Sequence, residues 1–229
     1  MRGFEAWAEK RMPLLLAEYK YQERFQHHHP VVPNAVHVPQ TRPTPGRDRV
    51  VYLGALTMER GAQEVVDVAT ILGEQEHPLT VEVIGQAHGQ ARELITQAHK
   101  DGVVRWHGFV PSAQALPMLD GALVGLSLLH DLPNYRHSMP TKILEYMAHG
   151  LPVITTPLPV ARDVVETAGS GTVVPFKEPA AVAAEILRLR ANPSVVEDFS
   201  RRGFSAVKQH YDWTALGNEF NTTMMGLIK

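Results

Sequence analysis

The chain has 229 residues, 44% of them hydrophobic, which is enough to fill the core of one large domain or two small ones. Its 22 Lys and Arg residues nearly balance 24 Asp and Glu residues, which argues against the broad basic surface that nucleic acid or anionic lipid requires. Cysteine is absent, which excludes disulfides, thiolate nucleophiles and cysteine metal sites. Because no stretch resembles a secretory signal or a membrane-spanning helix, we expect a cytoplasmic protein, with a peripheral position at the inner membrane face as a further option.

The first 48 residues are predicted to form an N-terminal helix and a linker. Residues 1–28 intersperse apolar side chains among Glu, Lys and Arg, as a helix does, although Pro13 should bend or break it. Residues 40–48 are rich in Pro, Arg and Gly, a composition that stops both helices and central strands. We therefore expect a boundary there, with residues 49–229 forming the main domain.

From Arg49 onward, short apolar runs alternate with helical patterns. The predicted strands are 50–54, 79–85, 103–108, 122–129, 152–156 and 171–175, and the predicted closing helices are 178–191, 193–209 and 212–227. Such apolar strands, each separated from the next by a helix, predict an α/β fold with a parallel sheet buried on both faces. Right-handed crossovers would bring the loops after the strands to one sheet edge, where open α/β sheets bind ligands.

The stretch SMPTKILEYMAHGLPVITT predicts a helix whose start faces that edge. Ser138 can cap the helix and Gly150 can end it, which fixes it at about 140–149. The free N–H groups of its first turn attract an anion such as phosphate, and Lys142 adds a full positive charge. Glu145, one turn deeper, can accept hydrogen bonds from two neighbouring hydroxyls. Phosphate beside a vicinal diol describes a ribonucleotide.

The alternative is that Lys142 and Glu145 form a solvated ion pair, worth about 0.2–0.5 kcal/mol. A second feature favours the anion site. The first strand ends in YLGALTMERG, where Gly54 and Gly61 bracket a turn and Arg60 stands at the start of the next helix. Arg60 alone would be interpreted as a solvated loop residue. Two cationic helix starts on neighbouring loops, one of them an arginine that can fork onto phosphate, indicate a phosphate site.

Four segments, YLGALTMERG, VEVIG, VRWHGFVP and above all PTKILEYMAHGLPVITT, resemble the donor-binding C-terminal domain of retaining glycosyltransferases of family 4. VVPNAVHV resembles the segment that leads into this domain, so the resemblance covers most of the chain from about Val31. It implies a Rossmann-like domain, one half of a GT-B enzyme that transfers a hexosyl group from a UDP- or GDP-sugar to a glycan or lipid-linked acceptor. It also implies that positive charge stabilises the departing diphosphate, without a metal or a cofactor.

The resemblance assigns residues to the parts of the donor. Arg60 and Lys142 would hold the diphosphate, and Glu145 would hold the ribose. Phe109 and Val110 would lie beside the nucleobase. The remaining candidates, placed near the diphosphate and the sugar, are Gly54, Asn134, Tyr135, Arg136, His137 and Thr141. No catalytic nucleophile is assigned, and the candidates for stabilising the leaving group are His137, Arg60 and Lys142.

The chain departs from the family pattern in three respects. Ala55 stands where many members carry an arginine, which removes one phosphate cation. His137 stands eight positions before Glu145, where many members carry a glutamate, so the resemblance supports the nucleotide contacts more strongly than the sugar contacts. Only about 30 residues precede VVPNAVHV, where the family has its acceptor domain, so we expect the chain to be the second half of such an enzyme, with its first helix a remnant of the other half. The chain would then be a fragment, a subunit whose partner chain supplies the acceptor domain, or a nucleotide- or partner-binding half-domain without catalysis.

Two other patterns carry less weight. Twelve histidines suggest metal binding, but the run at 27–29 points in different directions and is interpreted as polar surface. His88, His99 and His107 lack partner carboxylates at ligand spacing, so no metal site is predicted. The segment IGQAHGQA lacks the third glycine of a dinucleotide fingerprint, which leaves an NAD-dependent enzyme as a weak alternative.

Overall fold

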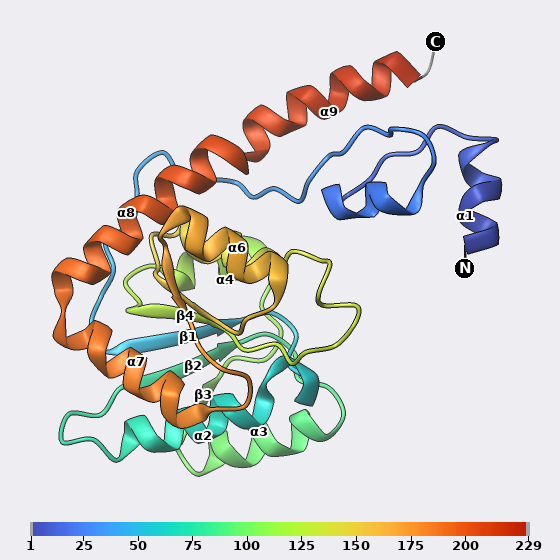
Figure 1. The fold of residues 1–229 in the computed structure, drawn as a ribbon. Helices are drawn as coiled ribbons and strands as arrows, with labels where there is room; N and C mark the ends of the chain where they lie inside the picture. Colours follow the sequence, from blue (N-terminus) through green and yellow to red (C-terminus); the bar gives the residue numbers. More distant parts are fainter. Residues whose placement is uncertain (1, 228–229) are drawn as a thin grey trace.

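The computed structural model describes residues 2–227, and at its centre lies a parallel sheet flanked by helices (Figure 1). The sheet contains six strands in the described part of the chain, in the order β3-β2-β1-β4-β5-β6, and every neighbouring pair is parallel. The strands are β1 Arg49–Leu53, β2 Thr80–Ile84, β3 Arg105–Trp106, β4 Val124–Ser127, β5 Val153–Thr155 and β6 Gly171–Val173. The predicted fold class is confirmed.

Helices cover both faces of this sheet. The helices of the sheet domain are α2 Ala62–Gly73, α3 Gln90–Lys100, α4 Ser112–Ala115, α5 Thr141–Ala148, α6 Pro159–Ala168, α7 Pro179–Ala191 and α8 Pro193–His210, with 3-10 turns η2 Met58–Arg60 and η3 Pro117–Leu119. α9, Trp213–Leu227, follows α8 and extends away from the sheet (Figure 1). Successive side chains of a strand point to opposite faces. Accordingly, Val50 and Tyr52 of β1 pack with α2, α3 and α7, whereas Val51 and Leu53 pack with α4, α5 and α6.

Tyr146 of α5 bridges β1 and β4, the two strands between which the strand order of the sheet reverses. β1 and β4 pair only at Val50 and Val51, and beyond these residues the Tyr146 hydroxyl lies between the two strands. It accepts a hydrogen bond from the Leu53 amide at 2.8 Å and donates one to the Leu126 carbonyl at 3.0 Å. Because the aromatic ring lies against Gly125, this contact fixes α5 firmly beside the switch point of the sheet.

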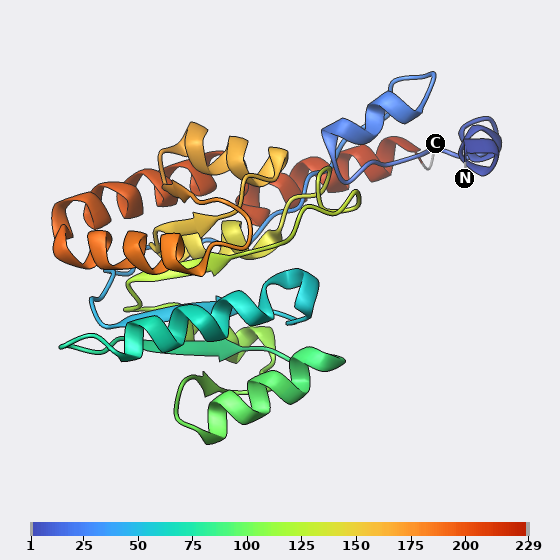
Figure 2. The ribbon, with the colours of Figure 1, turned by 60° about the horizontal axis from the view of Figure 1, so that its bottom comes forward.

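The N-terminal segment differs from the prediction. Instead of one helix over residues 1–28, the structure has a short α1, Arg2–Glu9, and a 3-10 turn η1, Tyr19–Arg24. Pro13 interrupts the helical pattern, and Leu16 then pairs with Val31 in an isolated bridge. This segment and the end of α9 extend from the sheet domain in the same direction (Figures 1 and 2).

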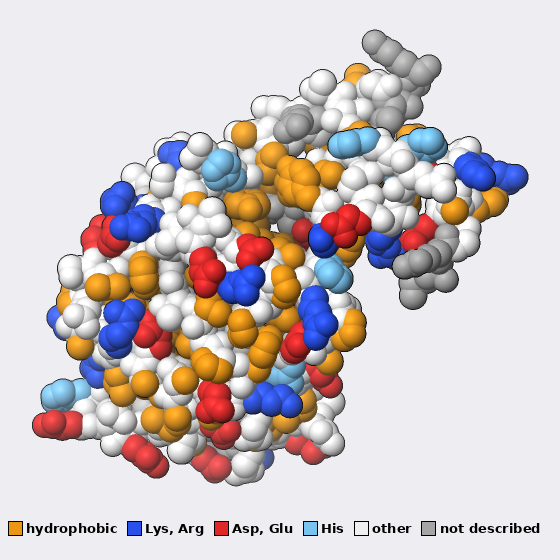
Figure 3. All heavy atoms as spheres, in the orientation of Figure 1, with side chains coloured by type: hydrophobic (Ala, Val, Ile, Leu, Met, Phe, Trp, Pro, Cys, Tyr) orange, Lys and Arg blue, Asp and Glu red, His pale blue; other side chains and the backbone are white. Residues whose placement is uncertain are grey.

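The predicted closing helices are present as α7, α8 and α9. β1 has the predicted length but lies one residue earlier, and the other strands are shorter than predicted. The two largest differences are β3, Arg105–Trp106 in place of 103–108, and β4, Val124–Ser127 in place of 122–129. Figure 3 shows Lys and Arg interspersed with Asp and Glu on one face of the molecule, without a broad basic area there. No helix described between residues 2 and 227 is long and apolar enough to cross a bilayer.

Candidate functional site

A cavity of about 410 Å³ opens at the carboxyl edge of the sheet, next to the switch point between β1 and β4. Open parallel sheets bind their ligands at this position. Its walls come from the loops after β1, β2 and β3 and from the start of α5. The predicted donor-binding residues that line it are Gly54, Arg60, Phe109, Val110, Thr141, Lys142 and Glu145.

The other four predicted residues lie in the loop between β4 and α5 and do not line this cavity. Arg136 makes two hydrogen bonds to Asp131, at 2.6 and 2.7 Å. Tyr135 is partly buried and packs against the hydrophobic cluster that contains α5. Asn134 and His137 are exposed. The structure therefore brings together the residues predicted for the nucleotide and leaves the four loop residues predicted for the diphosphate and sugar outside the cavity lining.

Lys142 is the most unusual residue of the cavity. Only 8% of it is exposed, and its Nζ has no hydrogen-bond partner among the described residues. The Nζ lies 3.6 Å from the centre of the Tyr52 ring, and its side chain passes close to Gly54. Burial, reinforced by the charge of Arg60, lowers the pKa of Lys142 to about 7, although Glu145 acts in the opposite direction. A solvated Lys142–Glu145 ion pair is thereby excluded.

Arg60 stands at the end of η2, directly before the first helix of the domain. Gly61 has a φ of 88° and serves as the N-cap of α2. A Cβ at this glycine would lie 2.6 Å from the Leu128 carbonyl oxygen, so only glycine allows the turn to pack on the end of β4. Among the described residues the guanidinium makes one hydrogen bond, from Nη1 to the Ala55 carbonyl at 3.4 Å. Its remaining donors can therefore serve a ligand.

The start of α5 supplies the third element of the site. Its N-cap is Pro140, without a side-chain cap, and Ser138 instead donates a hydrogen bond to the Asn134 carbonyl at 3.1 Å. The predicted capping by Ser138 is wrong. The Ile143 amide donates to the Pro140 carbonyl at 2.9 Å, and the amides of Thr141 and Lys142 have no side-chain cap. Glu145 is partly buried one turn further on, and burial raises its pKa despite the opposing effect of Lys142.

The turn after β3 forms the far wall of the cavity. Phe109 is 70% exposed, a large value for an aromatic ring in a folded domain. Sequence reasoning missed several neighbours that also line the cavity: Ile84, Gly85, Gln86, Ser112, Ala115 and Leu116. The rule that loops after parallel strands meet at one edge could have identified Gly85 and Gln86, which directly follow β2. α4 has only four residues and gives no periodic signal.

The histidines have carboxylate neighbours that spacing could not predict. His107 Nε2 lies 3.3 Å from Glu82 Oε2 on the adjacent strand, and His29 Nε2 lies 3.1 Å from Glu9 Oε1. Within residues 2–227, however, no three or more His, Asp and Glu side chains form a group that could hold a metal ion.

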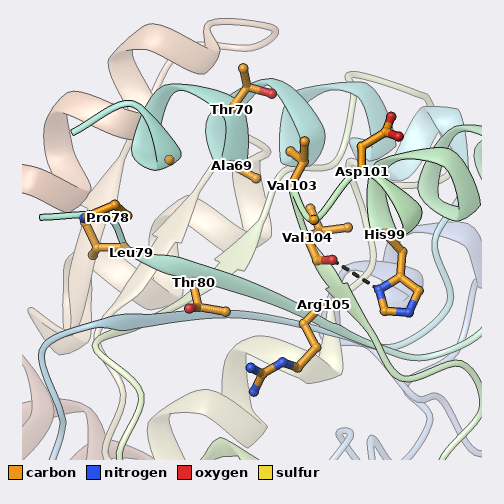
Figure 4. A pocket seen from close by; sticks show the side chains of 12 residues that line it. Ala69, Thr70, Pro78, Leu79, Thr80, His99, Asp101, Val103, Val104 and Arg105 are labelled. Atoms are coloured by element: carbon orange, nitrogen blue, oxygen red, sulfur yellow. Dashed lines mark hydrogen bonds between the residues drawn. The ribbon is translucent and has the colours of Figure 1, made fainter. Parts of the chain in front are cut away.

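A second hollow, of about 620 Å³, lies at the opposite edge of the sheet, beside Thr80 and Arg105 at the starts of β2 and β3 (Figure 4). His99 is turned toward the Val104 carbonyl, 3.2 Å away. Arg105 is bound to Glu82 at 3.0 Å. Because its cation is already paired and the hollow lies at the amino ends of the strands, the smaller cavity is the better candidate for a ligand.

Comparison with known proteins finds relatives in sequence and in fold. In sequence, the chain is 26% identical over 174 residues to the "Putative colanic acid biosynthesis glycosyltransferase WcaL" of Salmonella typhimurium, an alignment that covers 74% of this chain and 43% of that protein. The chain thus spans less than half the length of this relative.

Two solved structures show the same fold. Anabaena Alr3699/HepE, in complex with UDP and glucose, has a TM-score of 0.76 at 15% identity and covers 96% of this chain and 65% of that chain. The C-terminal domain of the glycosyl transferase group 1 family protein LpcC from Francisella tularensis matches with a TM-score of 0.62 at 18% identity. This match covers 77% of this chain and 95% of that chain. The fold matches one half of a GT-B glycosyltransferase. Since residues 47–192 match the family described as "Glycosyl transferases group 1", the chain belongs to that family.

Proposed function

We propose that this chain is the donor-binding half of a retaining, metal-independent glycosyltransferase of family 4 that uses a UDP- or GDP-sugar. The observation that carries the proposal is the buried Nζ of Lys142 beside Arg60 in the cavity at the switch point, which contacts the Tyr52 ring but has no hydrogen-bond partner among the described residues. Burying an ion without a partner costs several kcal/mol, so such a group is retained where a ligand supplies the opposite charge. A diphosphate is an anion of suitable chemistry.

In this proposal each wall of the cavity serves one part of the donor. Arg60, Lys142 and the first-turn amides of α5 hold the diphosphate. Glu145 accepts hydrogen bonds from the two ribose hydroxyls, because a carboxylate can accept two donors at once. The exposed ring of Phe109 and the neighbouring Val110 lie beside the nucleobase.

The catalytic contribution is electrostatic. When the bond between the sugar and the diphosphate breaks, negative charge develops on the leaving phosphate oxygen. Arg60, Lys142 and the α5 dipole are already in place, so they stabilise this charge without reorganisation. Because position 55 is an alanine and not an arginine, the turn after β1 has one cation fewer. Lys142 therefore provides a larger part of the positive charge that stabilises the leaving phosphate. His137 is a further candidate for stabilising the leaving group, and no nucleophile is assigned.

Further parts of the proposal have independent support. The UDP in the HepE complex favours a uridine nucleotide, and the colanic acid relative favours a role in polysaccharide biosynthesis, with a glycan or lipid-linked acceptor. Since the relatives are much longer, an acceptor-side domain would come from a longer form of the protein or from a partner chain. Balanced charge and the absence of cysteine are consistent with a cytoplasmic location.

Titration calorimetry with UDP, GDP, ADP and NAD tests the proposal. We expect UDP or GDP to bind and NAD not to bind. Lys142→Ala and Glu145→Ala should each weaken binding by about tenfold or more, the effect of losing one hydrogen bond to a charged group, while circular dichroism remains unchanged. Unchanged affinity in both variants would remove the basis of the assignment.

A second function is a half-domain that binds nucleotide or a partner without turnover. It is favoured by His137, because an imidazole cannot replace the carboxylate that many members carry at this position. Release of UDP from a bound UDP-sugar, measured with and without an acceptor-side domain, separates the two. Turnover only with that domain supports the enzyme, and binding without turnover under both conditions supports the second function.

A further inference from the structure

The loop between β4 and α5 is held at both ends by carboxylates from other parts of the chain. The contacts that hold it are at His130 and Met139, and the four residues predicted for the diphosphate and sugar of the donor lie between them. In Figures 1 and 2 this yellow-green loop extends from the sheet toward the blue N-terminal segment. Neither of the two carboxylates that hold it lines the nucleotide cavity.

Glu64 holds the beginning of the loop. It lies in the first turn of α2, is only 7% exposed, and its Oε1 is 2.8 Å from His130 Nε2. Its other oxygen, Oε2, is buried without a hydrogen-bond partner among the described residues. The His130 amide also donates to the Glu59 carbonyl at 2.9 Å, one residue before Arg60. Burying a carboxylate with a single partner costs desolvation free energy, so this contact does not stabilise the helix efficiently. We infer that Glu64 has another role.

Glu18 holds the end of the loop. Its Oε1 accepts a hydrogen bond from the Met139 amide at 2.9 Å and a longer one from Asn34 Nδ2 at 3.4 Å. Met139 is separated from the first residue of α5 only by Pro140. The N-terminal segment, which lies outside the sheet domain, therefore fixes the path of the chain into the helix that carries Lys142.

Between these two contacts the loop is bonded to itself. Arg136 binds Asp131 with both ends of its guanidinium, the Tyr135 amide donates to the Leu132 carbonyl at 2.9 Å, and Ser138 donates to Asn134. These internal hydrogen bonds hold the loop together as one unit. The positions of its two ends therefore decide where its exposed side chains point.

We propose that Glu64 and Glu18 are positioning residues that hold this loop so that Asn134 and His137 meet the sugar of the bound donor. The inference rests on the proposed function. It requires that the two carboxylates affect the preference for a nucleotide sugar over the bare nucleotide. Affinity for the nucleotide alone should change little, because Arg60, Lys142 and Glu145 lie outside the loop and α5 is also held by the Tyr146 hydrogen bonds to β1 and β4.

The test compares Glu64→Ala and Glu18→Ala with Glu64→Gln and Glu18→Gln. Glu74→Ala, an exposed carboxylate near the end of α2, is the matched control. Hydrogen exchange of residues 130–139 is measured in the unliganded chain. Affinities are measured by calorimetry for UDP and for UDP-glucose, UDP-galactose, UDP-N-acetylglucosamine and GDP-mannose.

We expect both Ala variants to exchange about tenfold faster in the loop, the factor for one lost hydrogen bond to a charged group. They should lose the wild-type preference for the nucleotide sugar over its nucleotide and keep nucleotide affinity within about twofold. The Gln variants should restore both properties, since the amide oxygen accepts the same hydrogen bonds. The control should match the wild type.

Unchanged exchange in both Ala variants would overturn the inference. So would equal weakening of nucleotide and nucleotide sugar, which a purely structural role produces, or a wild-type chain without any preference for a nucleotide sugar. If the wild type binds no nucleotide at all, the proposed function fails, whereas normal nucleotide binding with unchanged loop exchange removes only the positioning role.

Discussion

Two buried ionisable side chains, Glu82 in the sheet and Lys142 in the helix α5 beside it, have opposite surroundings. Glu82 of β2 is 5% exposed and is surrounded by Arg49 at 3.2 Å, Arg105 at 3.0 Å and His107 at 3.3 Å. Lys142 at the carboxyl edge is 8% exposed and has no hydrogen-bond partner among the described residues. We infer that the paired carboxylate of Glu82 stabilises the fold, whereas the amine of Lys142, which lacks such partners, binds a ligand.

The largest effect on stability should come from the satisfied cluster. Arg49 also donates to the carbonyls of Met118 and Asp120, both at 2.6 Å, so Arg49→Ala leaves Glu82 short of a partner and two carbonyls unpaired. We expect a loss of about 3 kcal/mol in the free energy of unfolding, measured by urea denaturation, because breaking a buried pair exposes its full desolvation penalty. UDP affinity should not change, and a loss of affinity without a loss of stability would contradict the distinction.

Removing the amine of Lys142 should have the opposite effect and raise the free energy of unfolding. Lys142→Met is expected to stabilise the unliganded chain by about 2 kcal/mol while abolishing UDP binding, because an apolar side chain replaces a buried ion. Burial lowers the pKa of Lys142 from 10.5 to about 7. Its destabilising effect is therefore complete below pH 7 and disappears as the pH rises toward 10.5.

Urea denaturation of Lys142→Met and the wild type at pH 6 and pH 9 tests this pH dependence of stability. The stabilisation should be larger at pH 6. A variant that is less stable than the wild type at both pH values would show that Lys142 contributes to the fold.

A smaller effect is expected where α5, which carries Lys142 and Glu145, is hydrogen-bonded to the sheet. Tyr146→Phe removes the hydroxyl that joins Leu53 to Leu126 and leaves one buried N–H and one buried carbonyl unpaired. We expect a loss of about 1.5 kcal/mol, together with a modest weakening of UDP binding as α5 loosens. Thermal unfolding and calorimetry measure the two effects, and equal stability of variant and wild type would show that β1 and β4 need no bridge.

The fold was largely predictable because its pattern is local. Apolar runs separated by helical segments indicate a parallel sheet, and the glycine at position 150 ends α5 with a φ of 69°, as predicted. Arg60, Lys142 and Glu145 were brought to one cavity because parallel strands place their following loops at the same edge.

The remainder depends on contacts between distant residues. The sequence places Lys142 in a polar first turn, and only the packing of Tyr52 beneath it shows that it is buried. Glu64 and His130 are 66 positions apart, so no spacing rule connects them. In the N-terminal segment, an interruption of the helix at Pro13 was predicted, whereas the pairing of Leu16 with Val31 was not.

The most direct test is whether UDP binding at pH 8 is accompanied by proton uptake at Lys142. With a pKa of about 7, this side chain is mostly neutral in the empty site at pH 8, and a bound diphosphate would favour its charged form. Calorimetry in two buffers with different ionisation enthalpies should therefore show proton uptake in the wild type and none in Lys142→Met, which should also bind UDP far more weakly. Equal affinity of the two proteins, with no proton uptake in either, would contradict the account.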